Sequence, residues 1–284
     1  MLKYLFIILA INFAQLDRSF NRTGDYAADR DGLIRLLPEA APGAEKAGIL
    51  WRISRDWLLV GQEEPDRDAK RACFAEGVRY AEMAIHENPN DPQGYLWHCA
   101  NLGRDAQTRN AMSQAKIVSK LTADLTTILD RLGRTDCSEA WQALSEIWWS
   151  HPFKSSDAAV NFARKSALTI PRDELRITTL THLADILYQR NWSAEKRAAA
   201  ALESGRKMAS SGKSNIEWFS HFDGAPAENL AAPWTDARIG ELSDRDEAKA
   251  IAAYAQRIFR DCPDPSPIDK NDIKILINLQ KKWQ

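Results

Sequence analysis

The chemical repertoire of this sequence depends first on its five His and four Cys. No HxxxH or HExxH pair is present, so zinc chemistry on one helix face has no anchor. The adjacent pair His98 and Cys99 does not replace it, because neighbouring helical residues point about 100° apart. No two cysteines form a CxxC motif. We interpret the cysteines as small apolar residues at buried or half-buried positions: Cys73, Cys99, Cys137 and Cys262.

Nucleophilic catalysis lacks a local motif as well. The sequence contains no G-x-S-x-G element and no phosphate-binding P-loop. His221 and Asp223 are close enough to share a small polar site, but a solvent-facing His beside packed aromatic rings is the simpler interpretation. We therefore expect a protein that is not an enzyme and needs no metal or cofactor. An enzyme that uses residues 213–243 is kept as an alternative.

Tryptophan gives the strongest hint of a binding role. The chain has ten Trp, and large aromatic side chains dominate both cores and interfaces. Three of them fit packing positions of the helical repeat described below: Trp51, Trp141 and Trp148. Three others are predicted to line a ligand or partner groove: Trp57, Trp97 and Trp149. A second set either closes that groove as a lid or seals the C-terminal end of the core: Trp218, Phe222 and Trp234.

Composition excludes several classes of protein. Apolar residues make up 44% and charged residues 27% of the chain, an ordinary mixture for a globular protein. Lys and Arg number 38 against 39 Asp and Glu, which gives a net charge of −1. A general nucleic-acid binder would show a clear positive excess, so no nucleic-acid partner is expected. A polybasic membrane-binding patch is disfavoured for the same reason.

The N-terminus reads MLKYLFIILAINFA, in which Lys3 precedes the apolar residues 4–11. This run is shorter than the roughly 20 apolar residues that span a membrane, and it fits the core of a secretory signal. Export with cleavage after Ala14 is the preferred prediction, and it places the protein outside the cytoplasm. The alternatives are an uncleaved membrane anchor over residues 1–14 and a buried N-terminal helix in a cytosolic protein.

The His, Cys and Trp residues are expected to lie mainly on helices. Residues 15–43 are polar and turn-rich, and are predicted to be a linker or a short helix. From residue 44 to about 208, helix-forming residues dominate and alternating β-branched runs are nearly absent. Short breaks rich in Gly, Pro, Asn, Asp and Ser separate the helices. An all-α fold is therefore predicted.

Helix pairs recur with the spacing of the tetratricopeptide repeat, which is about 34 residues long. The clearest pair has Trp141, Leu144, Ser145 and Trp148 on its first helix and Ala159, Ala163, Ser166 and Pro171 on its second. An earlier pair has Trp51 as its large residue, followed by Gly77, Ala81, Ala84 and Pro89. A later pair combines Leu180, Leu183, Ala184 and Leu187 with Ala198, Leu202 and Gly205. Residues 91–136 form a degenerate pair.

These pairs predict a tetratricopeptide-like solenoid of about four helix pairs over residues 44–212. Residues 213–243 are aromatic-rich and poorly helical, and a loop of about 30 residues is uncommon in a compact domain and often functional. Helices over 244–260 and 269–283 are predicted to cap the array. The last predicted segment, residues 213–284, therefore consists of the aromatic-rich loop and the capping helices.

The stretch Ile49-Leu-Trp-Arg-Ile-Ser-Arg-Asp56, followed by residues 80–84, Asn88-Pro89 and residues 96–100, resembles the tetratricopeptide family of regulators of microtubule dynamics. The architecture is also similar to that of the periplasmic T-component of TRAP transporters. The resemblance covers about residues 45–210. Ser54 stands where the family usually has Ala, Leu96 where it has Lys, and residues 213–243 have no counterpart.

This resemblance implies a non-catalytic scaffold that engages a protein partner or an apolar ligand. The likeness to transporter components suggests a periplasmic substrate-binding protein as that partner. A membrane- or cytoskeleton-associated adaptor, anchored by residues 1–14, is the alternative that the resemblance leaves open.

Overall fold

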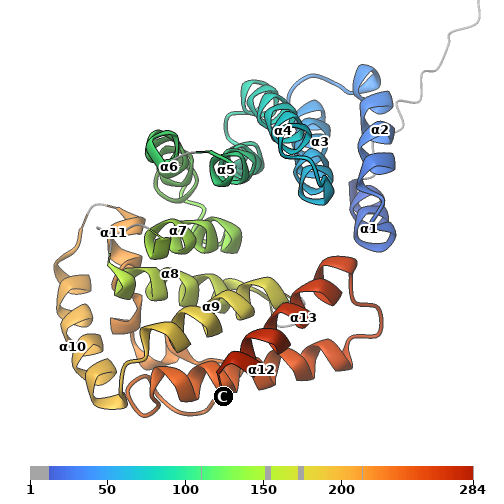
Figure 1. Ribbon diagram of the computed structural model, residues 1–284. Coiled ribbons are helices and arrows are strands. Elements are labelled where there is room, and N and C mark those ends of the chain that lie inside the picture. The colour runs from blue at the N-terminus through green and yellow to red at the C-terminus, as the bar shows by residue number, and fades with distance from the viewer. Residues whose placement is uncertain (1–12, 110, 151–154, 172–175, 213, 284) are drawn as a thin grey trace, which may run out of the picture. The chain divides into compact units, whose positions relative to one another are not determined.

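The computed structural model describes residues 13–109, 111–150, 155–171, 176–212 and 214–283. Regular structure in this part of the chain is helical, apart from one isolated bridge between Ile239 and Leu242 (Figure 1). The predicted all-α class is therefore confirmed for these residues. Most of the predicted signal segment, residues 1–12, lies outside the described part. None of the described helices combines the length and apolarity needed to cross a membrane.

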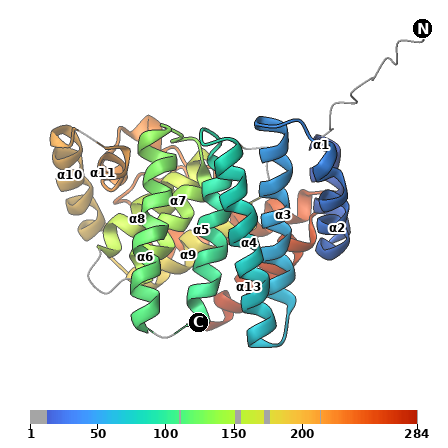
Figure 2. The same cartoon turned by 90° about the horizontal axis from the view of Figure 1, so that it is seen from above.

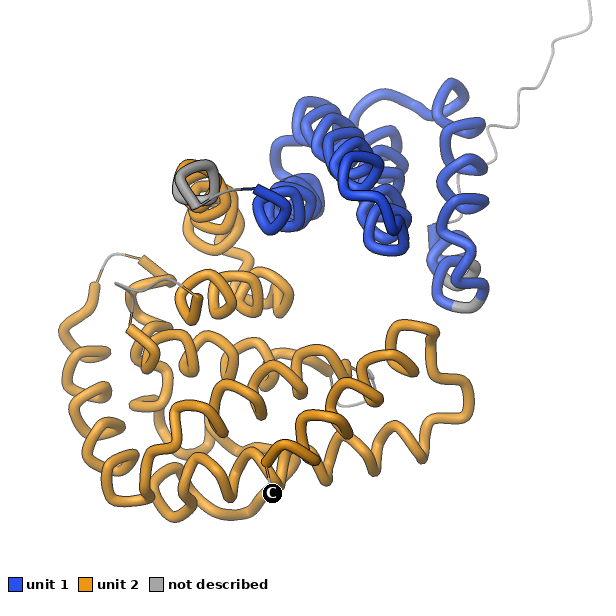
Figure 3. Tube along the Cα trace, viewed as in Figure 1, with its two compact units in different colours: residues 1–111 blue, residues 112–284 orange. Residues whose placement is uncertain are grey.

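The chain divides into two compact units, residues 1–111 and 112–284 (Figure 3). The first unit contains five α-helices within its described residues: α1 Phe13–Thr23, α2 Tyr26–Leu36, α3 Ala44–Glu63, α4 Arg67–Glu87 and α5 Pro92–Gln107. The segment 15–43, predicted as a linker or short helix, thus contains most of α1 and all of α2. Phe20 of α1 and Tyr26 and Leu33 of α2 are buried, and this burial of apolar surface stabilises the two helices.

Helix α3 is the centre of the first unit, and it packs against α2, α4 and α5 (Figure 2). Carboxylate caps begin three of these helices: the side chains of Asp25, Asp66 and Asp91 accept hydrogen bonds from the backbone at the starts of α2, α4 and α5. The apolar core of the unit comprises Leu33, Ile49, Leu50, Ile53, Tyr80 and Ala84.

The first helix pair packs in a different register from the predicted one. Trp51 is predicted to be its large core residue, but the side chain is only half-buried, whereas Leu50 and Ile53 are completely buried. The Trp51 ring lies along the guanidinium of Arg52, 3.9 Å from its central carbon. The packing face of α3 is therefore centred on Leu50 and Ile53, and Trp51 flanks it.

A buried polar contact joins α3, α4 and α5. The Ser54 hydroxyl donates to the Gly77 carbonyl at 2.7 Å, and the Asn101 amide donates to Ser54 Oγ at 3.1 Å. Glycine is required at position 77 because a Cβ there would lie 2.0 Å from Asn101 Oδ1. The small residues of this pair thus let three helices approach closely.

The second unit contains α6 Ala111–Thr126, α7 Ser138–Ser150, α8 Ser156–Thr169, α9 Ile177–Arg190, α10 Ala194–Ser210, α11 Asn215–Phe219, α12 Asp244–Asp261 and α13 Pro267–Lys282. A π-helical turn, Thr127–Arg131, follows α6. Two short 3-10 helices, Phe222–Gly224 and Ala227–Leu230, lie between α11 and α12. The segment 213–243 is therefore partly helical.

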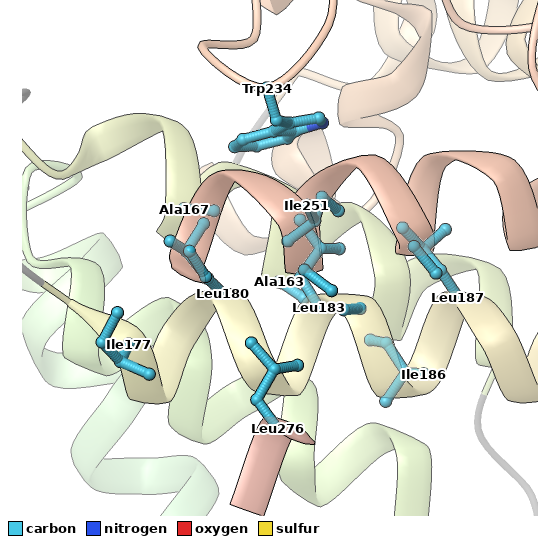
Figure 4. Packing of buried hydrophobic residues seen from close by; sticks show 14 of the residues in the cluster. Ala163, Ala167, Ile177, Leu180, Leu183, Ile186, Leu187, Trp234, Ile251 and Leu276 are labelled. Carbon is cyan, nitrogen blue, oxygen red and sulfur yellow. The ribbon is translucent and has the colours of Figure 1, made fainter. Parts of the chain in front are cut away.

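The core of the second unit lies around α9, which packs against α8, α12 and α13. Figure 4 shows Leu180, Leu183 and Leu187 of α9 beside Ile251 of α12, and the indole of Trp234 lies over α12. Leu276 brings α13 into this cluster. Figure 1 shows α12 and α13 beside α9, where they close this end of the unit.

The predicted pairing of α9 with α10 is not formed in the described residues. Helix α10 packs mainly against the short helix Phe222–Gly224, and the partners of α9 are α8, α12 and α13. Ala198 and Leu202, predicted to pack inside the pair, are exposed, with Leu202 exposed to 68%. The apolar face of α9 is satisfied by α12 and α13 instead, so part of the segment 213–243 covers α10.

Gly224 holds α10 in place by close backbone contact. A Cβ at Gly224 would lie 2.2 Å from Gly205 N and 2.5 Å from the carbonyl carbon of Ser204. Backbone atoms cannot move aside as a flexible side chain can, so Gly224→Ala should lower the free energy of unfolding by about 1–3 kcal/mol. Urea denaturation followed by circular dichroism measures this. Gly212→Ala is the control, because its Cβ would meet nothing within 4 Å; equal stability of both variants would contradict the prediction.

Candidate functional site

The two predicted groove residues of the first unit are half-buried. Trp57 packs beside the core, and the Arg30 guanidinium lies 4.1 Å from its ring centre. The Trp57 indole N–H is buried without a hydrogen-bond acceptor among the described residues. Trp97 donates its indole N–H to Gln93 Oε1 at 3.2 Å. Both rings thus belong partly to local packing.

The predicted residues of the second unit fall into two groups. Trp149 is half-buried against the main core, whereas Phe222 and Trp234 are only 5% and 8% exposed. Trp234 also donates its indole N–H to Glu247 Oε1 at 3.1 Å. For Phe222 and Trp234 this packing favours the seal over the lid of the two predicted alternatives. Trp218 remains half-exposed.

Trp218 lines a surface pocket of about 500 Å³. We call it the aromatic pocket, and its lining residues are Asp130, Thr135, Ser211, Gly212, Ser214, Asn215, Trp218 and Phe219. The rings of Trp218 and Phe219 meet edge to face, with centroids 4.6 Å apart. Phe219 in turn contacts the buried Trp141, at a centroid distance of 4.9 Å. The pocket wall is therefore continuous with the core.

Hydrogen bonds fix α11, which carries Trp218. The Ile216 N–H donates to Asp130 Oδ1 at 3.2 Å, and the Asn215 amide donates to the Leu129 carbonyl at 2.6 Å. Both acceptors belong to the π-helical turn, so α11 is tied to it at two points. The Trp218 indole N–H has no acceptor among the described residues. A half-exposed ring, held rigidly and with a free donor, is suited to bind an apolar group that carries a hydrogen-bond acceptor.

A buried ionic network lies behind the segment 213–243. It consists of three arginines and four carboxylates: Arg164, Arg190, Arg197, Asp157, Asp223, Asp244 and Glu247. Arg164 is 1% exposed; it donates from Nε to Asp223 at 2.6 Å and from Nη2 to Glu247 at 2.9 Å. Arg197 also binds Glu247 and donates to the Leu242 carbonyl at 2.7 Å.

The remaining members of the buried ionic network connect α8, α9 and α12. Arg190 donates to both oxygens of Asp244 at 2.8 Å and to Asp157 at 2.8 Å. Asp244 also accepts from the Trp192 N–H at 2.9 Å. Buried charges are tolerated only when they are paired in this way.

Electrostatics favour the charged forms of Glu247 and Arg164. Burial would raise the pKa of Glu247, but the guanidiniums of Arg164 and Arg197 and the Trp234 indole lower it to about 2. Burial lowers the pKa of Arg164, and the facing carboxylates of Asp223 and Glu247 raise it above its ordinary value. The network is thus a set of fixed charges that hold one another in place.

The geometry of the network argues for a structural role. A cavity of about 10 Å³ adjoins Arg164, Arg197 and Glu247, which is room for about one water molecule. Asp223, predicted with His221 as a small polar site, is committed to Arg164. Because Asp223 and Trp234 belong to the segment 213–243, the network fastens that segment to α8, α10 and α12.

Ser145 and His182 form the one Ser–His contact among the described hydrogen bonds, at 2.9 Å. Ser145 is completely buried and donates its hydroxyl proton to the Ala159 carbonyl at 2.7 Å. His182 Nε2 must therefore donate to Ser145 Oγ, and it cannot also accept the proton that a general base would take. Burial also lowers the pKa of His182. This pair is a packing contact between helices.

The remaining candidates for chemistry are the cysteine thiols and possible metal ligands. Cys73, Cys99 and Cys137 are buried and Cys262 is half-buried, all as free thiols, as their interpretation as small core residues predicts. Burial raises the pKa of Cys137 to about 12, which removes it as a nucleophile at neutral pH. Within the described ranges, no three His, Cys, Asp or Glu side chains gather closely enough to hold a metal ion.

The buried ionic network was not predicted from the sequence, because its partners lie 59 and 83 residues apart along the chain, as for Arg164 with Asp223 and with Glu247. Comparisons with known proteins add no further constraint on the site. No model of a known protein family matches the sequence, and no curated protein matches it significantly.

Proposed function

We propose that the protein is a non-catalytic binding protein built from tetratricopeptide-like helix pairs. The support is a pattern that occurs once in each unit. Leu50, Ile53, Ser54 and Trp57 on α3 have the same spacing as Trp141, Leu144, Ser145 and Trp148 on α7. On the following helices, Gly77, Ala81 and Ala84 match the spacing of Ala159, Ala163 and Ser166.

The two copies also share their hydrogen bonds. Ser54 donates to the carbonyl of Gly77 and Ser145 to that of Ala159, each at 2.7 Å. In the first unit, Asn101 of the next helix, α5, contacts the Ser54 hydroxyl. In the second unit, His182 of the next helix, α9, contacts the Ser145 hydroxyl. Equivalent buried polar contacts at equivalent positions support a repeated packing unit.

The binding site that this proposal favours is the aromatic pocket. The observation that carries it is Trp218, a half-exposed indole whose N–H has no acceptor among the described residues, held by two hydrogen bonds at the base of its helix. An apolar or aromatic group from a protein partner, or an apolar small ligand, would pack on the Trp218 and Phe219 rings and accept from this N–H. We place this activity outside the cytoplasm, on the basis of the apolar residues 4–11, with residues 1–14 retained as an uncleaved anchor, because Phe13 and Ala14 belong to α1.

Trp218→Ala tests the site. Partner capture from native cells should fall at least fivefold, which corresponds to about 1 kcal/mol for an aromatic contact, because the variant loses both the ring and the donor. Trp192→Ala is the matched control, since Trp192 is also half-buried in the second unit but does not line the pocket. Thermal unfolding shows whether each bait is folded. Equal capture of the same partners by a folded Trp218→Ala bait would contradict the proposal.

A further inference from the structure

Two buried arginines of α3 share one carboxylate from α1. Arg52 donates from Nε and Nη2 to the two oxygens of Asp17, at 2.9 and 2.6 Å. Arg55 donates from Nη1 to Asp17 Oδ1 at 3.0 Å. The arginines are 6% and 7% exposed. Bidentate pairing of this kind is specific for planar anions such as carboxylates.

Aromatic rings complete the surroundings of these guanidiniums. The central carbon of Arg52 lies 3.9 Å from the ring centre of Trp51 and 4.3 Å from that of Phe13. The central carbon of Arg55 lies 3.3 Å from the ring centre of Phe20. Trp51 comes from α3, whereas Phe13 and Phe20 come from α1. We call Arg52, Arg55 and Trp51, together with Gly48 on the same face of α3, the two-arginine site.

Helix α1 fills this site with one face. Phe13, Leu16, Asp17 and Phe20 have the i, i+3, i+4, i+7 spacing by which an amphipathic helix occupies a groove. Gly48 of α3 leaves room for the Phe13 ring, because a Cβ at this position would lie 2.7 Å from it. In the described part of the chain, the hydrogen bonds that join α1 to α3 run between side chains. Helix α1 connects to α2 through Gly24 at φ +66°.

Asp17 is bound in its charged form. Burial would raise the pKa of this carboxyl, but hydrogen bonds and charge from Arg52 and Arg55 lower it below its ordinary value. Its side chain is 35% exposed, so water reaches the ion pair from one side. An exposed edge of this kind gives a competing carboxylate a route to the arginines.

We propose that the two-arginine site is a recognition site for an amphipathic helix that presents a carboxylate between aromatic residues. Helix α1 is its intramolecular ligand, and a helix of the same pattern from a protein partner takes the place of α1. This site lies in the first unit, so the proposal stands or falls independently of the aromatic pocket.

The test uses a fluorescently labelled peptide with the α1 sequence, residues 13–23, and full-length chains as hosts. In the wild-type host, α1 competes at the high effective concentration of a tethered ligand. The Asp17→Ala host loses the anchoring carboxylate of α1, so it should bind the peptide at least tenfold more tightly than wild type. The Asp31→Ala host is the control: Asp31 is an exposed carboxylate on α2 that pairs with Arg30, and this host should bind like wild type.

A second peptide, with Asn in place of Asp17, tests the role of charge. It should bind the Asp17→Ala host at least tenfold more weakly than the parent peptide, because the guanidiniums lose their anion. Hydrogen exchange of the α1 amides reports whether α1 has left the site. Equal binding of both peptides would overturn the proposal, and so would a host that releases α1 but binds neither peptide. Unchanged protection of α1 in Asp17→Ala, without peptide binding, would overturn it as well.

Discussion

Glutamine in place of Glu247 should lower the free energy of unfolding of the second unit by about 3–5 kcal/mol at neutral pH, the cost of removing one partner from a buried ion pair. Glu247 binds the guanidiniums of Arg164 and Arg197 and accepts from the Trp234 indole. Glutamine nearly keeps the shape but carries no charge. It also places an NH₂ group against a guanidinium donor. Two buried cations would then lose part of their compensation.

Urea denaturation followed by tryptophan fluorescence measures this loss. Glu228→Gln is the control: its side chain is exposed on a short 3-10 helix of the same unit, and a surface change of this kind costs less than about 0.5 kcal/mol. A Glu247→Gln chain as stable as the control would show that the network is not what fastens the segment 213–243.

The pH dependence of this effect has a definite sign. The pKa of Glu247 is about 2 in the folded protein against an ordinary value of 4.5. Its contribution to stability is therefore complete above pH 4.5 and is lost as the pH falls through 2. The difference in unfolding free energy between wild type and Glu247→Gln should narrow over that interval.

Helices were predictable because their signals are local. Capping carboxylates, short polar breaks and helix-forming composition lie within a few residues of each other, and the cap at Asp91 before Pro92 is an example. The register of α3 was less predictable. Trp51 is one of the two largest residues of its helix, yet it flanks Arg52 while Leu50 and Ile53 enter the core. Size alone does not decide burial when a charged neighbour offers a ring a favourable face.

The candidate site depended on contacts that periodicity does not encode. Phe222, Trp234 and Trp218 all lie in one aromatic-rich segment, but the first two are core and the third lines a pocket. What separates them is the buried ionic network, which draws Asp223 and its neighbour Phe222 inward. That network joins residues 33 to 83 positions apart, beyond the range of any local pattern. The predicted pairing of α9 with α10 was wrong for the same reason. Helices α12 and α13, which cover α9 instead, are distant from it in the sequence, whereas α10 is adjacent.

Asp56 should make the stability of the first unit depend on pH. Its side chain is completely buried; Oδ1 accepts from Arg55 Nε at 3.0 Å, and Oδ2 has no hydrogen-bond donor among the described residues. Burial raises the pKa of Asp56 to about 7; Arg55 lowers it only in part, and Asp29 and Asp17 add to the rise. The folded protein therefore pays a desolvation cost to ionise this carboxyl.

The sign of the linkage follows from that pKa. Between the ordinary value of 3.8 and about 7, the folded state holds a proton on Asp56 that the unfolded state releases. The unfolding free energy of the first unit should thus decrease as the pH rises through this interval, and level off above it. The full shift corresponds to about 4 kcal/mol, and relaxation around Arg55 reduces the expected loss to about 2–4 kcal/mol.

Asp56→Asn should abolish this loss, because asparagine resembles the protonated acid at every pH. Histidines and other carboxyls titrate in the same interval, so the decisive quantity is the difference between wild type and variant at pH 5 and again at pH 8. Hydrogen exchange of the α3 amides measures it within the first unit. We expect the variant to be more stable than wild type by a small margin at pH 5 and by a clearly larger margin at pH 8, because most of the loss falls between these two pH values. Asp31→Asn, an exposed carboxyl on α2, should follow wild type at both pH values. If Asp56→Asn also followed wild type, Asp56 would be ionised and compensated in the folded protein, and Arg55 would then bind Asp17 and Asp56 as two full anions.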